Sequence, residues 1–181
     1  QDDIVYDGSK MPNKVIHTAL GSGDDAVDCL PTSPRTGYYL RKLLREDVNV
    51  DPISVSSQKH FITHVRYTEI FLNYAEAANE AWGPDGTGSH AYSARDVLAA
   101  IRKRAGISQP DSYLASVTSQ DDMRALIHNE RRLELCFEGF RFWDLRRLNA
   151  DLTEAVKWVH IQDGKYNYFV VEQRNYDNDY M

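Results

Sequence analysis

Three glutamates with the residue type and spacing for acid–base chemistry, Glu130, Glu134 and Glu138, lie in a stretch dense with charge at residues 119–148. Two such carboxylates can serve as the general acid and the general base of a hydrolase. The same four-residue spacing beside many arginines is, however, more typical of ion pairs along a helix. We therefore interpret the three glutamates as part of a structural clasp of Arg–Glu pairs and keep catalysis as the alternative.

The helix that must position these glutamates is expected over residues 119–137. Ser119 followed by Asp121 and Asp122 predicts its start, because a serine cap and acidic side chains suit the positive end of the helix dipole. Apolar residues then recur at three- and four-residue spacing and form one face: Met123, Leu126, Ile127, Leu133, Cys136 and Phe137. Gly139 is a suitable stop for this helix.

Glu130 falls inside that apolar face. A buried carboxylate must be paired or neutral, since an unpaired buried charge costs several kcal/mol. Its partner should come from another helix or from the arginines nearby in the sequence, which are Arg131, Arg132, Arg141, Arg146 and Arg147.

Two further helices are predicted upstream, at residues 62–82 and 91–105. The first is apolar on nearly every side, so we expect it to be sandwiched between other helices. Its thin polar stripe consists of Arg66, Glu69, Asn73, Glu76 and Glu80. The second helix presents an apolar face and ends at Gly106, where a left-handed backbone costs glycine nothing. Together they predict a tetratricopeptide-type αα-hairpin.

The remainder of the chain predicts long loops with a few short β-strands. Residues 1–35 are rich in glycine and proline, with strand candidates at residues 4–6 and 15–16. In the tail we expect a short helix at Asp151–His160, a turn at Asp163–Gly164 and a strand at Tyr166–Val171. The sequence thus predicts a mainly α fold in a single domain, 1–181, made of a loop and short-strand region (1–61), a helical core (62–148) and a mixed tail (149–181).

Composition excludes some classes of function. The net charge of the 181-residue chain is −6, and no lysine or arginine run is present, which argues against a nucleic-acid partner. No apolar stretch approaches the length of a membrane span. The chain begins QDDIVYDGS, without an initiator methionine or a leader, so we expect it to be part of a longer protein.

The sequence also lacks the motifs of common catalytic sites, namely GxSxG, a glycine-rich phosphate loop, HExxH and CxxC. His60 and His64 have helical spacing, but no second pair of metal ligands accompanies them. Cys29 and Cys136 have no metal-ligand spacing, and the sequence leaves open whether they form a disulfide. We therefore expect no enzyme, no cofactor and no metal ion.

Three ordered stretches, at residues 66–86, 97–107 and 130–148, resemble the C-terminal helical core of SusD/RagB-like proteins. The flanking stretches VYDGS (5–9) and TGYYLRK (36–42) are also similar to that family. The charged positions that carry the resemblance, and that form the expected clasp, are Arg66, Glu69, Glu76, Glu130, Arg131, Glu134, Glu138, Arg141, Asp144 and Arg147.

The resemblance implies a non-enzymatic glycan-binding subunit on the outer membrane of Bacteroidetes-type bacteria. Such a subunit would be a surface lipoprotein whose lipid anchor lies outside this chain. It would capture oligosaccharides or polysaccharides and deliver them to a TonB-dependent transporter of the SusC type. Two alternatives remain, a helical-repeat interaction module without a small ligand of its own and, less favoured, a glycoside hydrolase that uses two of the clasp carboxylates.

Sugar sites combine aromatic faces with polar groups, and loops carry most recognition residues. The candidates for ligand binding lie before the first long helix: Tyr38, Tyr39, Arg41 and His60. The alternative for each of them is ordinary packing, since exposed aromatic residues are common without a ligand.

Overall fold

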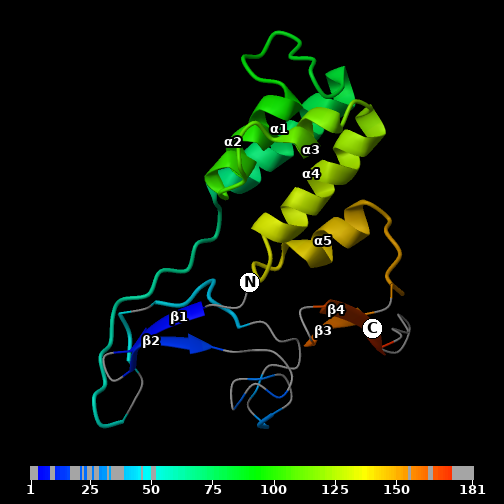
Figure 1. The fold of residues 1–181 in the computed structure, drawn as a ribbon. Helices are drawn as coiled ribbons and strands as arrows, with labels where there is room; N and C mark the ends of the chain where they lie inside the picture. Colours follow the sequence, from blue (N-terminus) through cyan, green and yellow to red (C-terminus); the bar gives the residue numbers. More distant parts are fainter. Residues whose placement is uncertain are drawn as a thin grey trace. The chain divides into compact units, whose positions relative to one another are not determined.

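The chain folds into two compact units, shown in Figure 1. The computed structural model describes residues 4–8, 11–16, 21, 23, 26, 29–31, 33, 39–45, 47–49, 52–154, 156–162 and 165–172. Residues 62–149 form the helical unit, whereas residues 1–61 and 150–181 form the second unit, which contains two β-hairpins. The prediction of a mainly α fold with a few short strands is confirmed.

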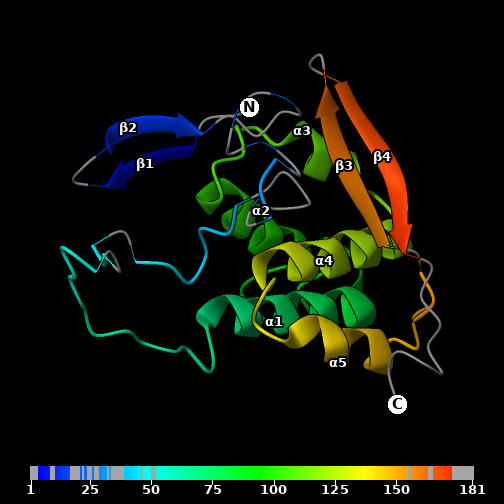
Figure 2. The same cartoon turned by 90° about the horizontal axis from the view of Figure 1, so that it is seen from below.

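The helical unit contains α1 (Tyr67–Trp82), α2 (Ala94–Arg104), α3 (Ser112–Ser116), α4 (Gln120–Glu134) and α5 (Phe140–Arg147). α1 contacts both α2 and α4. Figures 1 and 2 show α1 and α4 side by side, and α5 follows α4 along the chain. Leu72 of α1, Leu98 of α2 and Ile127 of α4 are fully buried, so the core lies where these three helices meet.

Local capping explains where α4 begins and where α2 begins and ends. Ser119 accepts a hydrogen bond from the backbone N–H of Asp122, which confirms the predicted start of α4. Ser93 and Asp96 form a capping box at the start of α2. Gly106 follows α2 with φ +90°. A Schellman motif ends the helix: the Gly106 N–H donates to the Lys103 carbonyl, and the Ile107 N–H donates to the Arg102 carbonyl.

α1 begins at Tyr67, five residues later than the sequence predicts. Arg66 has an extended backbone (φ −118°, ψ 147°) and no side chain caps the helix. Instead, the Arg66 guanidinium donates to the Glu134 carbonyl and to the Glu138 carboxylate. A long-range ion pair therefore fixes this end of the helix, and that contact is invisible to a local reading of the sequence.

The predicted sandwiching of α1 is wrong within the described residues. Its buried side faces α2 and α4 and includes Leu72, Ala75 and Ala78. The opposite side is largely exposed, with Tyr67 at 83% and Phe71 at 51%. Three residues of the polar stripe, Asn73, Glu76 and Glu80, contact arginines of α4 and α5. Much of the apolar surface faces solvent instead, so the expected roles of the two surfaces are partly exchanged.

α4 ends at Glu134, three residues before the predicted end. The chain then turns through Phe137 (φ +63°), and Gly139 (φ +83°) begins α5 rather than stopping α4. This turn brings Leu135 into the core, where it is 2% exposed, and leaves Phe137 70% exposed. Neither α3 nor α5 is predicted from the sequence.

The second unit contains two antiparallel hairpins. β1 (Ile4–Gly8) pairs with β2 (Met11–Ile16), and these strands include the candidates at residues 4–6 and 15–16. β3 (Val156–Gln162) pairs with β4 (Lys165–Glu172). The predicted helix at Asp151–His160 is therefore wrong: pairing with β4 and the β-branched residues of VKWVHIQ favour a strand. The predicted turn at Asp163–Gly164 lies outside the described residues.

The loop after α1 wraps closely around Trp82, whose ring centroid lies 5.2 Å from that of His90. A Cβ placed on Gly86 would lie 2.2 Å from the Trp82 carbonyl oxygen. A Cβ on Gly88, where φ is +55°, would lie 2.6 Å from the Trp82 indole. Glycine is therefore required at both positions for the loop to approach the end of α1.

We expect Gly86→Ala to lower the stability of the helical unit by about 1–3 kcal/mol, because the new methyl group meets backbone that cannot rotate away. The measurement is a denaturant melt followed by circular dichroism. Ser89→Ala, at an exposed position of the same loop, serves as the control and should change nothing. Equal melts for all three proteins would show that the loop tolerates a side chain at Gly86.

Candidate functional site

One guanidinium, that of Arg102, joins α2 to α4 and to the start of α3. Its Nη1 donates to Glu130 Oε1 at 2.5 Å, and its Nε donates to Asp111 Oδ2 at 2.6 Å. The three side chains are at most 10% exposed. Asp111 Oδ1 also accepts the backbone N–H of Leu114 and so caps α3. Buried Glu130 is thus paired with a residue from another helix.

The sequence reasoning missed both Arg102 and Asp111. A signal for Arg102 exists, since it lies four residues after Leu98 and next to Ile101 on the inward face of α2. An arginine at the edge of an apolar stripe, in a protein with a buried glutamate, is a natural partner for that carboxylate. Asp111 follows Pro110 and stands three residues before Leu114, which is the spacing of a helix cap.

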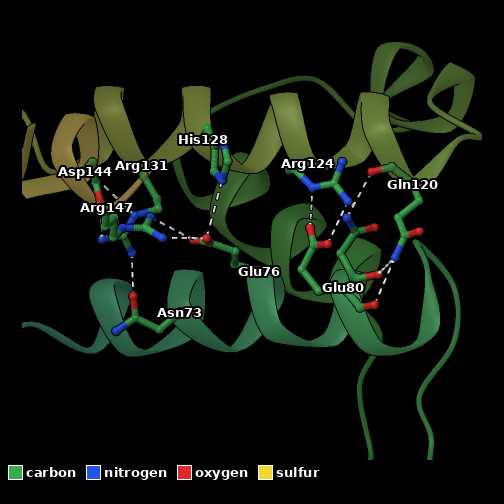
Figure 3. A network of polar contacts seen from close by, with 10 residues as sticks. Asn73, Glu76, Glu80, Gln120, Arg124, His128, Arg131, Asp144 and Arg147 are labelled. Atoms are coloured by element: carbon green, nitrogen blue, oxygen red, sulfur yellow. Dashed lines mark hydrogen bonds and ion pairs between the residues drawn. The ribbon is translucent and has the colours of Figure 1, made fainter. Parts of the chain in front are cut away.

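A second network joins α1, α4 and α5 (Figure 3). Arg131 of α4 donates to Asn73 Oδ1 at 2.6 Å and pairs with Asp144 at 3.2 Å. Arg147 of α5 donates to Asp144 at 2.7 Å and grips both oxygens of Glu76, at 2.6 and 2.9 Å. Each carboxylate therefore meets at least one arginine, and the bidentate pair fixes the direction of α5 relative to α1.

The same interface continues toward the C-terminal end of α1, as Figure 3 shows. Arg124 of α4 grips both oxygens of Glu80, at 2.5 and 2.6 Å. The side-chain amides of Asn79 and Gln120 each donate to the other's backbone carbonyl. His128 Nε2 lies 3.4 Å from Glu76 Oε1 between these two groups of contacts. The polar stripe of α1 is thus an interface with α4.

The other predicted clasp residues lie around this interface. Glu134 pairs with Arg104 of α2, and Glu138 pairs with Arg66. Glu69 lies in the first turn of α1, where a negative charge suits the helix dipole. Arg141 lies in α5, and neither it nor Glu69 forms an ion pair with another described residue.

Arginine neighbours set the protonation of the carboxylates. Burial alone would raise the pKa of Glu76, but the hydrogen bonds and charge of Arg147 outweigh it, so the pKa is lowered. The pKa of Asp144 is lowered for the same reason by Arg147 and Arg131. Hydrogen bonds from Arg102 lower the pKa of Asp111. These groups are anions at neutral pH and are unsuited to donate a proton to a glycosidic oxygen.

The residues predicted to bind a ligand lie before α1. Tyr38 is outside the described residues. Tyr39 is half-buried, whereas Arg41 and His60 are exposed. The structure therefore leaves two polar candidates, Arg41 and His60, facing solvent.

Arg45 joins the two segments before α1 on which these candidates lie, the one that follows Arg41 and the one that precedes His60. Its guanidinium forms a bidentate pair with Asp47 and donates to the Lys59 carbonyl at 2.7 Å. This contact brings the backbone beside His60 to the segment that follows Arg41.

Two hollows lie in the helical unit, and neither is lined by Tyr39, Arg41 or His60. The larger, of about 700 Å³, is a mostly apolar groove between α1 and α2 that includes Tyr67, Phe71 and Tyr92. The smaller, of about 350 Å³, lies between α3 and α4 and has mixed polar and apolar walls. The sequence reasoning predicted neither hollow, because each depends on how two helices pack.

Comparison with protein families identifies the chain. The model of the SusD family matches residues 6–180, nearly the whole sequence. The chain belongs to the SusD family. This match includes both compact units, so the hairpin unit is part of the family's sequence pattern as well as the helices.

Two curated relatives of this SusD-family chain come from Formosa agariphila. SusD-like protein P38 is 32% identical over 106 residues, which is 56% of this chain and 19% of that protein. SusD-like protein P2 is 33% identical over 87 residues, 46% of this chain and 16% of that protein. The matches thus span less than a fifth of each relative. No solved structure matches the chain.

No described helix has the length and apolar character needed to cross a membrane. No cluster of three or more His, Cys, Asp or Glu side chains among the described residues is placed to hold a metal ion. Cys29 and Cys136 do not form a disulfide with each other.

We expect Glu130→Ala to destabilise the helical unit by about 3–5 kcal/mol, because it leaves Arg102 buried with less negative charge around it. Thermal and denaturant melts measure the change. Asp121→Ala removes a carboxylate from the same helix at an exposed site, and it should cost less than about 1 kcal/mol. Equal losses for the two variants would contradict a special role for the buried pair.

Stability should also depend on pH through Glu76 and Asp144. Their pKa values are lower in the folded protein than in the unfolded chain. The stability that they contribute is therefore fully present above the unfolded values of about 4 and is lost as the pH falls through the folded values. Thermal melts should be constant from about pH 7 to pH 5 and fall below about pH 4.

Glu76→Gln supplies the control for this pH dependence. The variant should be less stable than the parent at pH 7 and should lose less further stability on acidification, since one of the linked carboxylates is absent. Parallel pH profiles for the parent and the variant would show that Glu76 does not contribute to the acid transition.

Proposed function

We propose that this chain is part of a non-catalytic, glycan-binding subunit that delivers oligosaccharides to a SusC-type TonB-dependent transporter. The observation that carries the proposal is the match to the SusD family over residues 6–180. In this proposal the intact protein is a surface-exposed lipoprotein of the outer membrane, and its lipid anchor lies outside the present sequence.

The arrangement of the carboxylates supports a binding role over a hydrolytic one. Glu130, Glu134 and Glu138 are held by Arg102, Arg104 and Arg66, respectively. A glycosidase needs one carboxyl group that is protonated and one that is free to attack or to activate water. Carboxylates bound to arginine in a helix interface serve instead to hold the helices in register.

A rigid scaffold with exposed loops suits glycan capture. The ion pairs fix α1, α4 and α5 together, so side chains carried by these helices lose little conformational entropy when a ligand binds. We propose that Tyr38, Tyr39, Arg41 and His60 contribute to the glycan site, with the tyrosine rings against sugar C–H groups and the polar groups toward hydroxyls.

A second candidate function, a protein-interaction module, is favoured by the groove between α1 and α2. Tyr67, Phe71 and Tyr92 line it and are all more than half exposed. Exposed apolar surface of this kind is typical of protein contacts. Such a contact is compatible with glycan binding elsewhere on the protein.

The test is binding of the full-length protein to a panel of polysaccharides by affinity electrophoresis, followed by calorimetry with the oligosaccharide that binds best. We expect binding without bond cleavage, weakened about three- to tenfold by Tyr39→Ala through loss of a ring contact. Tyr38→Ala should act in the same direction.

Tyr67→Ala is the matched control, since it removes an exposed tyrosine from the groove between α1 and α2 and not from the proposed glycan site. It should leave glycan affinity unchanged. If no glycan binds while the transporter still co-purifies in a Tyr67-dependent manner, the interaction module replaces the glycan-binding proposal.

A further inference from the structure

The smaller hollow lies between α3 and one face of α4. Tyr113, Ser116 and the following Val117 form one wall, and α4 supplies Asp122, Ala125, Leu126 and Asn129. These α4 positions follow the three- and four-residue spacing of a single helix face. A volume of about 350 Å³ is near the lower end for small-molecule sites.

The floor of the hollow is apolar and one side is aromatic. Val117 and Leu126 are buried, at 7% and 4% exposed, whereas the Tyr113 ring is 59% exposed. The Arg102 guanidinium lies 5.5 Å from the Tyr113 ring centroid. The buried arginine that joins α2, α3 and α4 therefore also holds this ring in place through a cation–π contact. The exposed part of the Tyr113 ring is available to a ligand.

The rim carries hydrogen-bonding groups with unused capacity. Asp122 Oδ2 accepts the Ser119 hydroxyl at 2.7 Å, and no described residue donates to Asp122 Oδ1. Ser116 Oγ donates to the Tyr113 carbonyl at 2.7 Å and keeps its lone pairs for a donor. The Asn129 carboxamide forms no hydrogen bond with another described residue, so it can both donate and accept.

We propose that this hollow binds one uncharged sugar ring of an oligosaccharide, a subsite that rests on the proposed glycan-binding function. Tyr113 contacts the C–H face of the ring, Val117 and Leu126 contact its edge, and Asp122 and Asn129 bind its hydroxyls. Asp122 repels a uronate or a sulfated sugar, while Arg102 is already engaged by two carboxylates. The subsite thus selects neutral glycans.

The test uses calorimetry of the full-length protein with the neutral oligosaccharide that binds best in the panel. Asn129→Ala and Tyr113→Ala should each weaken binding about three- to tenfold, by loss of hydrogen bonds or of the ring contact. Ala125→Phe fills the hollow from an exposed position and should weaken binding at least as much. Tyr113→Phe keeps the ring and should bind nearly as well as the parent.

Trp143→Ala is the control, because it removes an exposed aromatic side chain of α5 that lines neither hollow. It should leave the affinity unchanged. Thermal melts accompany each variant. If Tyr113→Ala does not fold, Asn129→Ala and Ala125→Phe decide the question, since both sites are exposed and neither change removes a buried group.

The outcomes separate the two proposals. A parent protein that binds glycan, with Asn129→Ala and Ala125→Phe within about twofold of it, overturns the subsite and leaves the glycan-binding function standing. A parent protein that binds no glycan of the panel overturns both. Preference for an acidic over a neutral oligosaccharide of the same length also overturns the subsite.

Discussion

The contact of Arg102 with Glu130 and Asp111 is the constraint on which the helical unit depends. One buried guanidinium forms ion pairs with two carboxylates. One of these carboxylates, Asp111, also caps α3 and so fixes where that helix begins. Buried ions are poor sources of net stability, because desolvation offsets most of their attraction. Their effect is instead geometric, since any other register of α2 against α4 would leave a charge buried without a partner.

The same logic explains the unusual use of the surface of α1. Its side chains Asn73, Glu76 and Glu80 contact arginines of α4 and α5. The helix can then leave aromatic residues on its outer side, where they are available to another molecule. The ionic interface on one side of α1 orients the helices. The apolar surface on the other side is available for binding.

The proposed glycan-binding role is consistent with this separation of an ionic interface from exposed aromatic surface. Sugars are recognised by many weak contacts, so affinity depends on how well the contacting groups are held in place. In the helical unit, the buried arginine that holds the helices also contacts Tyr113 at the hollow between α3 and α4. Scaffold and candidate subsite are thus parts of one network, and the paired carboxylates have a structural use that does not require catalysis.

The sequence by itself determined those features that depend on neighbouring residues. The Ser119 cap, the glycine after α2 and the need of Glu130 for a partner could all be predicted from local spacing, as could the mainly α fold. Only the tertiary structure decided that the partner is Arg102, that α4 ends at Glu134, and that residues 156–162 form a strand rather than a helix. The tertiary structure also decided where the two hollows lie, one between α1 and α2 and the other between α3 and α4. The physical reason is that capping energies act within one helical turn, whereas ion pairing, strand pairing and cavity shape depend on groups tens of residues away in the chain.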